Sequence, residues 1–411
     1  MKPQKMIESA EMTVKQGFMD RLASVKDSFK ADRAFTLFLI VGALSGIANG
    51  IHSTTFNNFL SEIYHLSAAE RGIVEFPREM PGVLIMFVLG VLSFMGNIRM
   101  AALGMLFAAL GMVGLGLFSP TYVSMLVWMM VLSLGTHIFI PLAPAIGMDL
   151  SEKSQYGIRL GRYNAYNLAA TILGYGIVWL GFRYLNFNYT SAFVLAALFF
   201  VASAVVLGMM KPDKPQKKKM QFVFRKKYML FYTLSIVNGA RKQIFMTFAP
   251  WVLIQVFNVD TPTFAVLGFV VSVVSILTRT IVGNGIDKLG ERFILCIEAV
   301  ILIVICMGYA FAENLFPVHI AVIIIAACYI IDNSLTAVGM ARSTYVKKIA
   351  VQPEDVTPTL SAGTSFDHVV AMSIPYFGGL VWASLGYQYV FLCAAAIAVI
   401  NLLLSLRVKI D

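Results

Sequence analysis

Residues 210–228 read MKPDKPQKKKMQFVFRKKY and carry eight Lys or Arg residues, with long apolar regions on both sides. This basic stretch separates two apolar halves of similar length, residues 34–210 and 228–411, and residues 211–227 form the linker between them. Loops rich in Lys and Arg stay on the cytoplasmic side when the apolar segments beside them cross a membrane. The linker therefore predicts the orientation and the depth of the flanking segments.

The composition of the chain is typical of an integral membrane protein. Of 411 residues, 58% are hydrophobic and 13% are charged, and the mean hydropathy is +0.77. One soluble core of this length does not bury so much apolar surface. The net charge of +10 would suit a nucleic-acid partner in a soluble protein, but here the basic residues lie between apolar runs. We therefore expect a lipid bilayer as partner and no nucleic acid.

Apolar runs long enough to cross a bilayer recur along the chain. A helix needs about 20 apolar residues to span a hydrocarbon core of about 30 Å. Twelve runs meet this length, at residues 34–58, 72–94, 99–119, 122–148, 162–184, 190–210, 228–256, 264–286, 293–312, 318–342, 360–384 and 387–406. They predict an all-α membrane protein with twelve transmembrane helices.

The distribution of Lys and Arg predicts the orientation of these spans. With both termini in the cytoplasm, only Arg71 and Arg183 of the 32 Lys and Arg residues face outward. Four others lie inside predicted spans, away from the span ends, namely Arg78, Arg241, Lys242 and Arg279. We therefore place the chain in the cytoplasmic membrane with both ends inside. Residues 1–33 have apolar side chains at helical spacing among Lys residues. This pattern predicts an interfacial helix, with a disordered tail as the alternative.

The two halves also resemble each other residue by residue. Five residues between positions 47 and 59 recur between positions 236 and 248 at a constant offset of 189: Ile47, Asn49, Gly50, Phe56 and Phe59 match Ile236, Asn238, Gly239, Phe245 and Phe248. Transporters built from internal repeats have such symmetry. The halves are therefore expected to be pseudo-symmetric, with His52 equivalent to Arg241.

A short motif begins at the end of the eighth predicted span and continues beyond it. Residues 283–292 read GNGIDKLGER, with Gly283, Asp287, Gly290 and Arg292 at its fixed positions. Together with the twelve spans and the basic linker, this motif resembles the major facilitator superfamily (MFS). The resemblance implies two six-helix halves that transport a solute by alternating access. Gly283 would permit close helix approach, and Asp287 would cap a helix and pair with Arg292. These four residues are therefore expected to form a conformational latch.

Several charges lie deep inside predicted spans, where each costs at least about 2.5–3.5 kcal/mol. Arg241 and Lys242 lie about 20 Å from the linker along their span, close to the midplane. The resemblance implies that the two spans related by the repeat line a central cavity. Arg241, Lys242 and His52, with Asn49 and Asn238, are therefore expected to bind an anionic group of a substrate. The alternative is that both cations are permanently paired with acidic neighbours.

Four carboxylates inside the spans are candidates for proton coupling, namely Asp332, Glu75, Glu79 and Asp367. A carboxylate in an apolar cavity gains proton affinity, so its loading can couple transport to a proton gradient. Asp332, near the middle of its span, is the best single candidate. Glu75 and Glu79 are also the expected partners of the deep cations. For Glu75, Glu79 and Asp332 the alternative is a structural ion pair, whereas Asp367, with His368, could instead gate the inner mouth of the cavity or cap the span 162–184.

These features predict a monomeric, proton-coupled secondary transporter of a small organic solute, with an anionic solute favoured by the basic cluster. The rival is a lipid or amphiphile exporter, which a lateral opening between the spans 162–184 and 264–286 or 72–94 and 360–384 would favour. A non-transporting receptor is a further alternative. The chain lacks the His-Glu-x-x-His motif and a Gly-rich phosphate loop, so we expect no enzyme and no catalytic residue. Its four cysteines lack partners at metal-ligand spacing, so no metal or cofactor is expected.

Overall fold

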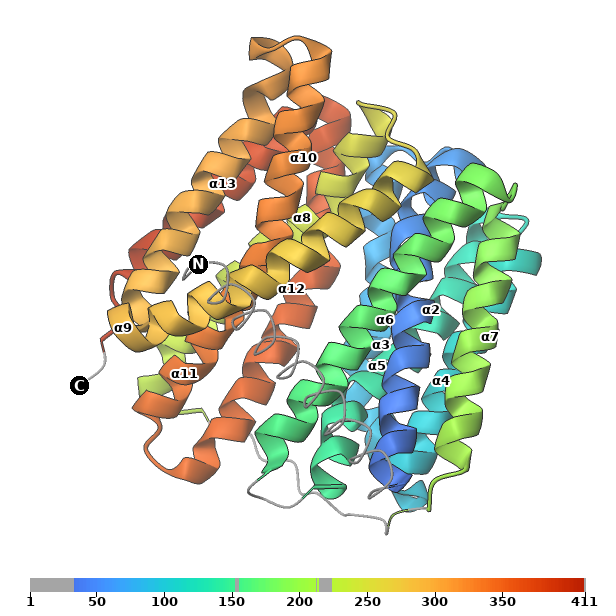
Figure 1. Ribbon diagram of the computed structural model, residues 1–411. Helices are drawn as coiled ribbons and strands as arrows, with labels where there is room; N and C mark the ends of the chain where they lie inside the picture. Colours follow the sequence, from blue (N-terminus) through green and yellow to red (C-terminus); the bar gives the residue numbers. More distant parts are fainter. Residues whose placement is uncertain (1–32, 152–154, 212, 214–223, 410–411) are drawn as a thin grey trace, which may run out of the picture.

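A computed structural model describes residues 33–151, 155–211, 213 and 224–409 (Figure 1). Within these ranges the regular structure is helical. The interfacial helix expected in residues 1–33 and most of the basic linker lie outside the described residues, so both stay predictions.

Two groups of helices follow the two halves of the sequence. In the described ranges, the first half forms α2 (Arg33–Tyr64), α3 (Ala68–Leu92), α4 (Asn97–Leu117), α5 (Tyr122–Asp149), α6 (Tyr156–Tyr184) and α7 (Tyr189–Gly208). The second half forms α8 (Met229–Gln255), α9 (Thr261–Leu315), α10 (Val318–Ser334), α11 (Gly339–Ile349), α12 (Val356–Leu385) and α13 (Tyr387–Ser405). Figure 1 shows the first group on the right, blue to green, and the second on the left, yellow to red. The predicted all-α fold in two halves is confirmed.

The helices in the described part of the chain are consistent with twelve spans. Ten segments there are long and apolar enough to cross a membrane. One of them is α9, which Gly290 divides into two helices (φ 82°, ψ 164°). Another is Val318–Ile349, which joins α10 and α11 through a 3-10 turn. α8 is not among the ten, because polar residues interrupt its apolar sequence. Counting α9 twice and adding α8 reproduces the twelve predicted runs.

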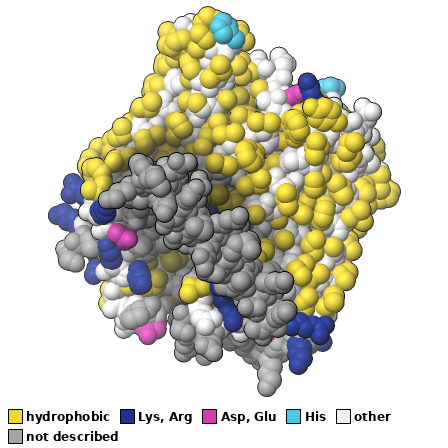
Figure 2. Space-filling model, viewed as in Figure 1, with side chains coloured by type: hydrophobic (Ala, Val, Ile, Leu, Met, Phe, Trp, Pro, Cys, Tyr) yellow, Lys and Arg dark blue, Asp and Glu magenta, His cyan; other side chains and the backbone are white. Residues whose placement is uncertain are grey.

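The bundle has two ends, which differ in charge. We call the end where α7 finishes and α8 begins the linker end, and the opposite one the far end. On the face drawn in Figure 2, hydrophobic side chains cover the sides of the molecule, and Lys and Arg gather at the linker end, at the bottom. An apolar belt with basic residues on one side is the pattern of a protein that crosses a bilayer.

Side-chain caps start four helices at the far end. Ser67, Thr121, Asn188 and Asp260 each accept a hydrogen bond from the backbone N–H three residues later, at the start of α3, α5, α7 and α9. A cap satisfies one of the backbone donors that the first helical turn leaves unpaired. These four residues therefore fix the positions at which the chain turns back into the bundle.

α2 and α6 pack with their backbones in close approach. A Cβ added to Gly46 would lie 2.4 Å from the carbonyl oxygen of Asn167, and one added to Gly50 would lie 2.4 Å from that of Thr171. The amide of Asn167 also donates to the carbonyl of Gly42 over 2.8 Å. Glycines spaced by four residues let two transmembrane helices touch in this way. This contact fixes the rotation of α2, and with it the side of the helix that faces the second half.

The two halves meet at the far end. Asn58 of α2 donates to the carbonyl of Val259 over 2.9 Å, and Gln255 of α8 donates to the hydroxyl of Ser61 over 2.7 Å. α3 and α12 also lie close together, because a Cβ on Gly72 would come within 2.2 Å of the carbonyl oxygen of Pro375. The halves are therefore closed against each other at this end.

Candidate functional site

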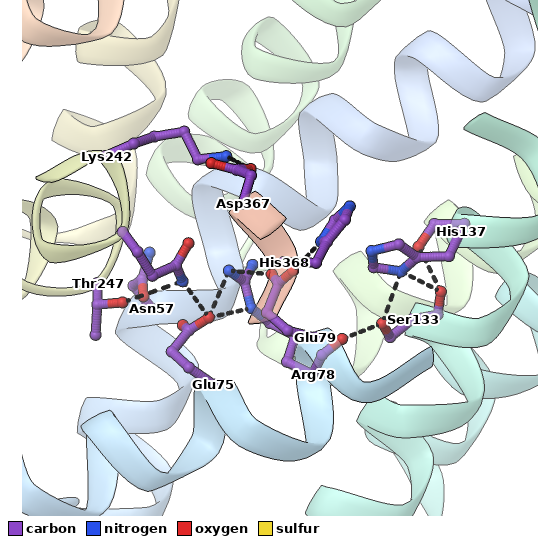
Figure 3. A network of polar contacts seen from close by, with 12 residues as sticks. Asn57, Glu75, Arg78, Glu79, Ser133, His137, Lys242, Thr247, Asp367 and His368 are labelled. Carbon is purple, nitrogen blue, oxygen red and sulfur yellow. Dashed lines mark hydrogen bonds and ion pairs between the residues drawn. The ribbon is translucent and has the colours of Figure 1, made fainter. Parts of the chain in front are cut away.

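Charged side chains gather at mid-depth in the bundle, on α3, α8, α10 and α12. Figure 3 shows those of α3, α8 and α12. Arg241 lies twelve residues after the first residue of α8, which is about 18 Å along the helix. Glu79 lies eleven residues into α3 from the far end, which is about 16 Å. Charges at this depth need partners, because an uncompensated charge is costly in a membrane.

The two cations of α8 are paired within the second half. Nη1 of Arg241 lies 2.6 Å from Oδ1 of Asp332 on α10, and both side chains are at most 10% exposed. Lys242 forms an ion pair with Asp367 of α12. The prediction that Glu75 and Glu79 are the partners of these cations is wrong, because the partners come from α10 and α12. The alternative of paired cations matches these contacts, whereas the substrate-binding role of Arg241 and Lys242 stays a prediction.

α3 carries its own ladder of alternating charges. Glu75 lies 2.5 Å from Arg71 and 2.5 Å from Arg78, and Arg78 is 3.1 Å from Glu79. Arg71 also donates to the amide oxygen of Asn57 on α2 over 3.1 Å. Arg78 lies between Glu75 and Glu79 in sequence and contacts both, so it offsets the repulsion between these two carboxylates.

Two contacts join this ladder to the second half. The amide of Gln243 on α8 donates to Oε2 of Glu75 over 2.8 Å. Nδ1 of His368 on α12 lies 3.0 Å from Oε2 of Glu79. In Figure 3, the ring of His368 lies between Glu79 and His137 of α5. Both contacts cross from one half to the other, so they must break if the halves separate at the far end.

A polar cavity of about 220 Å³ lies between the halves. His52, Arg71 and Arg78 line it from the first half, and Asp332 and Asn333 line it from the second. In the part of the chain that the structure describes, Nε2 of His52 is buried and has no hydrogen-bond partner. An unpaired polar atom next to a cavity is costly unless a ligand or water pairs with it. The cavity is therefore the best candidate for a substrate site.

A second cavity, of about 330 Å³, lies on the other side of the Arg241–Asp332 pair. Asn238, Arg241, Lys242 and Asp367 all line it. The structure thus brings three of the five predicted substrate-binding residues to this cavity and places His52 at the other one. The fifth residue, Asn49, is exposed on the same helix as His52.

The motif GNGIDKLGER is arranged differently from the predicted latch. Asp287 and Arg292 are both exposed, and no ion pair between them appears among the contacts of the described residues. A Cβ on Gly283 would have nothing within 4 Å, so the expected close helix approach is absent there. Gly290 has a left-handed φ of 82°, which a glycine adopts without strain. Its role is therefore to end the first helix of α9.

Other ion pairs brace the linker end of the second half. Glu291, directly after Gly290, lies 2.7 Å from Lys348, and Glu298 lies 2.9 Å from Arg342. Both carboxylates are fully buried, and both pairs join α9 to α11. A latch role for the motif stays a prediction, with these pairs as the contacts through which it would act.

Asp213 of the linker makes the kind of helix cap that was expected of Asp287. Its two carboxylate oxygens accept hydrogen bonds from the backbone N–H groups of Asn97 and Ile98 over 2.7 and 2.9 Å, at the start of α4. A negative charge stabilises a helix at its amino terminus. Asp213 therefore supplies the carboxylate that stabilises the start of α4.

The charged side chains of α3, α8, α10 and α12, with the amides beside them, form what we call the polar centre. Sequence reasoning missed three of these amides, namely Asn57, Gln243 and Asn333. The signal was present, because each interrupts an apolar run, and Gln243 directly follows Arg241 and Lys242. Amides carry no charge, so a search for charged residues inside the spans passed over them. They are hydrogen-bonded or line the cavity in the structure.

Two helical halves around a charged centre with cavities define a membrane transporter fold. The chain belongs to the Major Facilitator Superfamily, whose family model matches residues 38–350. A comparison with curated protein sequences finds no match.

Solved structures of transporters share this fold. A bacterial homologue of the human lysosomal transporter Spinster, inward-facing and occupied, has a TM-score of 0.68 at 14% identity, covering 91% of this chain and 95% of that one. The nucleoside transporter NupG has a TM-score of 0.71 at 14% identity, covering 90% and 98%. The D-xylose-proton symporter has a TM-score of 0.68 at 13% identity, covering 91% and 97%. At these identities the likeness shows the fold alone.

Proposed function

We propose that this protein is a secondary active transporter that moves a small organic anion together with a proton by alternating access. The observation that carries the proposal is the buried Arg241–Asp332 pair, which lies between two polar cavities. A likeness in fold to a structure described as a proton symporter agrees with proton coupling.

The charges of the polar centre balance each other, which limits how an anion can bind. Four cations pair with four carboxylates: Arg71, Arg78, Arg241 and Lys242 with Glu75, Glu79, Asp332 and Asp367. An anion that entered this centre alone would add an uncompensated buried charge, which is costly. A cation must therefore be released from its carboxylate before an anion can bind.

Arg241 is the cation best placed for this exchange. Its ion pair is with Asp332, and its Nε is buried without a hydrogen-bond partner among the described residues. A proton on Asp332 would neutralise its carboxylate and free the guanidinium of Arg241. The guanidinium would then form a bidentate pair with a carboxylate or another planar anion of the solute. Proton and anion would then enter together, with no net charge added. His52 and Asn333, which line the same cavity as Asp332, would hold the polar part of the solute.

The test is the pH dependence of anion binding. A panel of small organic acids is screened by thermal shift on the purified protein, and the affinity for the stabilising acid is then measured across pH. If one proton binds with each anion, the affinity rises about tenfold for each unit by which the pH falls. This rise should stop at low pH, where Asp332 is already protonated. Asp332→Asn should bind with an affinity that no longer depends on pH, and should not accumulate the acid in proteoliposomes under a proton gradient.

Glu313→Gln is the matched control, because Glu313 receives a hydrogen bond from Tyr387 at the far end, away from the cavities. It should keep the pH dependence of the wild type. A normal pH dependence or normal accumulation in Asp332→Asn would refute the role of Asp332. Stabilisation by neutral or cationic solutes alone would refute the anionic substrate.

We further propose that the linker end faces the cytoplasm, that both termini lie there and that the protein is a monomer in the cytoplasmic membrane. The orientation rests on the excess of Lys and Arg at the linker end. The contacts that close the far end then correspond to a state facing inward. The polar centre would be loaded and unloaded from the cytoplasm in this state.

A lateral apolar cavity favours a second candidate, the export of an amphiphile. It measures about 570 Å³ and lies between α6 and α9, which contain the predicted spans 162–184 and 264–286. Leu173, Gly176 and Leu180 line it from α6, and Val266 and Phe269 line it from α9. An apolar lining at this place would suit an alkyl chain that enters from the bilayer.

Gly176→Phe tests this candidate, because a Cβ at Gly176 meets nothing within 4 Å and the added ring would fill the cavity. The probe is dodecyl phosphate, added to the protein in nanodiscs. For an amphiphile transporter, Gly176→Phe should weaken its binding at least tenfold, and Leu198→Phe, on the exposed side of α7, should leave it unchanged. Equal binding by the wild type and Gly176→Phe would reject the second candidate.

A further inference from the structure

Three potential metal ligands meet at the boundary between the halves. Glu79 of α3, His137 of α5 and His368 of α12 each place a ligand atom within 4.8 Å of the others. The three residues are far apart in the sequence, so no spacing motif marks them. Their combination of two imidazoles and one carboxylate is a ligand set that proteins use for Zn²⁺ and Fe²⁺.

The hydrogen bonds of His137 prepare its ring for a metal ion. Nδ1 of His137 lies 2.9 Å from the backbone carbonyl oxygen of Ser133 on the preceding turn of α5 and 3.0 Å from the hydroxyl of Ser133, which donates its own proton to the carbonyl of Arg78. A carbonyl accepts but does not donate, so Nδ1 carries the proton and Nε2 of the neutral ring keeps a free lone pair. Histidine ligands of metals are usually oriented by such a bond from their other nitrogen.

A glycine leaves the space in which the two rings meet. A Cβ on Gly82 of α3 would lie 2.7 Å from Nε2 of His137 and 3.2 Å from Cε1 of His368. The ring centroids of His137 and His368 are 5.5 Å apart. Any larger residue at position 82 would push the imidazoles away, so the free nitrogen of His137 and the ring of His368 share a pocket that only glycine permits.

From this geometry we propose that Glu79, His137 and His368 bind a divalent transition-metal ion, for which Zn²⁺ is the reference. Bonds of about 2.0–2.2 Å to the ion would bring the ligand atoms to about 3.4 Å from each other, a closure of the present spacing that side-chain rotations can supply. A water molecule would fill the fourth position, as in zinc sites that keep one ligand place open.

Arg78 sets the strength of this site. It lies 3.1 Å from Oε1 of Glu79, so part of the negative charge of this carboxylate is already compensated. Arg78 is closer to Glu75, at 2.5 Å, which leaves Oε2 of Glu79 for His368 or for an ion. The affinity should therefore be moderate, and the two imidazoles should contribute most of it.

Metal binding would act on the transport cycle, because the ligands belong to both halves. Glu79 and His137 are in the first half and His368 is in the second. An ion held by all three would fasten the halves together near the centre, in the state that is closed at the far end. Zn²⁺ should therefore inhibit transport by holding this state.

The test measures Zn²⁺ binding by titration calorimetry on the full chain in nanodiscs, without a histidine tag. The wild type should bind one ion per chain, His137→Gln and His368→Gln should each bind at least tenfold more weakly, and His319→Gln, on the exposed start of α10, should bind like the wild type. Equal affinity in the wild type and both cluster variants, or no binding by the wild type, would overturn the proposal.

A second measurement needs no variant and so does not depend on whether the variants fold. The zinc-edge X-ray absorption spectrum of the wild type with one equivalent of Zn²⁺ should show the outer-shell scattering of two imidazoles. A spectrum with oxygen ligands alone, or with sulfur, would place the ion elsewhere and reject the site. Neither measurement depends on the identity of the transported solute.

Discussion

Gly50 and Gly283 both lie within transmembrane helices, but their surroundings give opposite predictions at the scale of single residues. A Cβ on Gly50 would lie 2.4 Å from the backbone oxygen of Thr171, whereas one on Gly283 would meet nothing within 4 Å. Gly50→Ala must therefore push α2 and α6 apart, at a cost of about 1–3 kcal/mol. Gly283→Ala should instead stabilise its helix by up to about 1 kcal/mol, because alanine has the higher helix propensity.

The measurement is the midpoint of thermal unfolding of both variants in the same nanodiscs as the wild type. We expect a lower midpoint for Gly50→Ala and an unchanged or higher one for Gly283→Ala, which serves as its matched control. Equal shifts in the same direction would contradict the packing described for α2 and α6. A lower midpoint for Gly283→Ala would instead support the close helix approach that the motif predicted at Gly283.

At the scale of helices, hydropathy and length predicted where the chain crosses the membrane, because both depend on local sequence alone. The ends were less accurate. α2 was expected to end at residue 58 but continues to Tyr64, since a helix does not stop where its apolar run stops. Residues 287–292 were expected to be a loop, yet only Gly290 leaves the helical conformation there. A single residue with a left-handed φ is enough to separate two helices.

The sequence did not predict the partners of the buried charges, for a different reason. Arg241 was found from its depth, but its partner Asp332 is 91 residues away, and Asp367 is 125 residues from Lys242. Which side chains meet depends on the rotation of each helix about its axis. Backbone contacts such as that of Gly50 set this rotation, and one unaligned sequence does not reveal them. The residue types of the centre were therefore predicted, and their pairing was not.

At the scale of the whole molecule, alternating access requires the far-end contacts between the halves to break in every cycle. Asn58 and Val259 are joined across this boundary over 2.9 Å, whereas Thr190 and Gly116 are joined over 2.9 Å within the first half. A covalent link at the first pair should stop transport completely. The same link at the second pair should leave transport intact, because a half that moves as a rigid body keeps its internal contacts.

Both pairs are replaced by cysteines in a background in which Cys296, Cys306, Cys328 and Cys393 are changed to alanine. Each protein is treated with a short reducible cross-linker in proteoliposomes, and uptake of the solute that stabilises the wild type is compared before treatment, after it and after reduction. We expect the link across the halves to abolish uptake and reduction to restore it. Uptake that survives a complete cross-link at 58 and 259 would mean that the far end does not open, and the rocking of two halves would then fail as the mechanism.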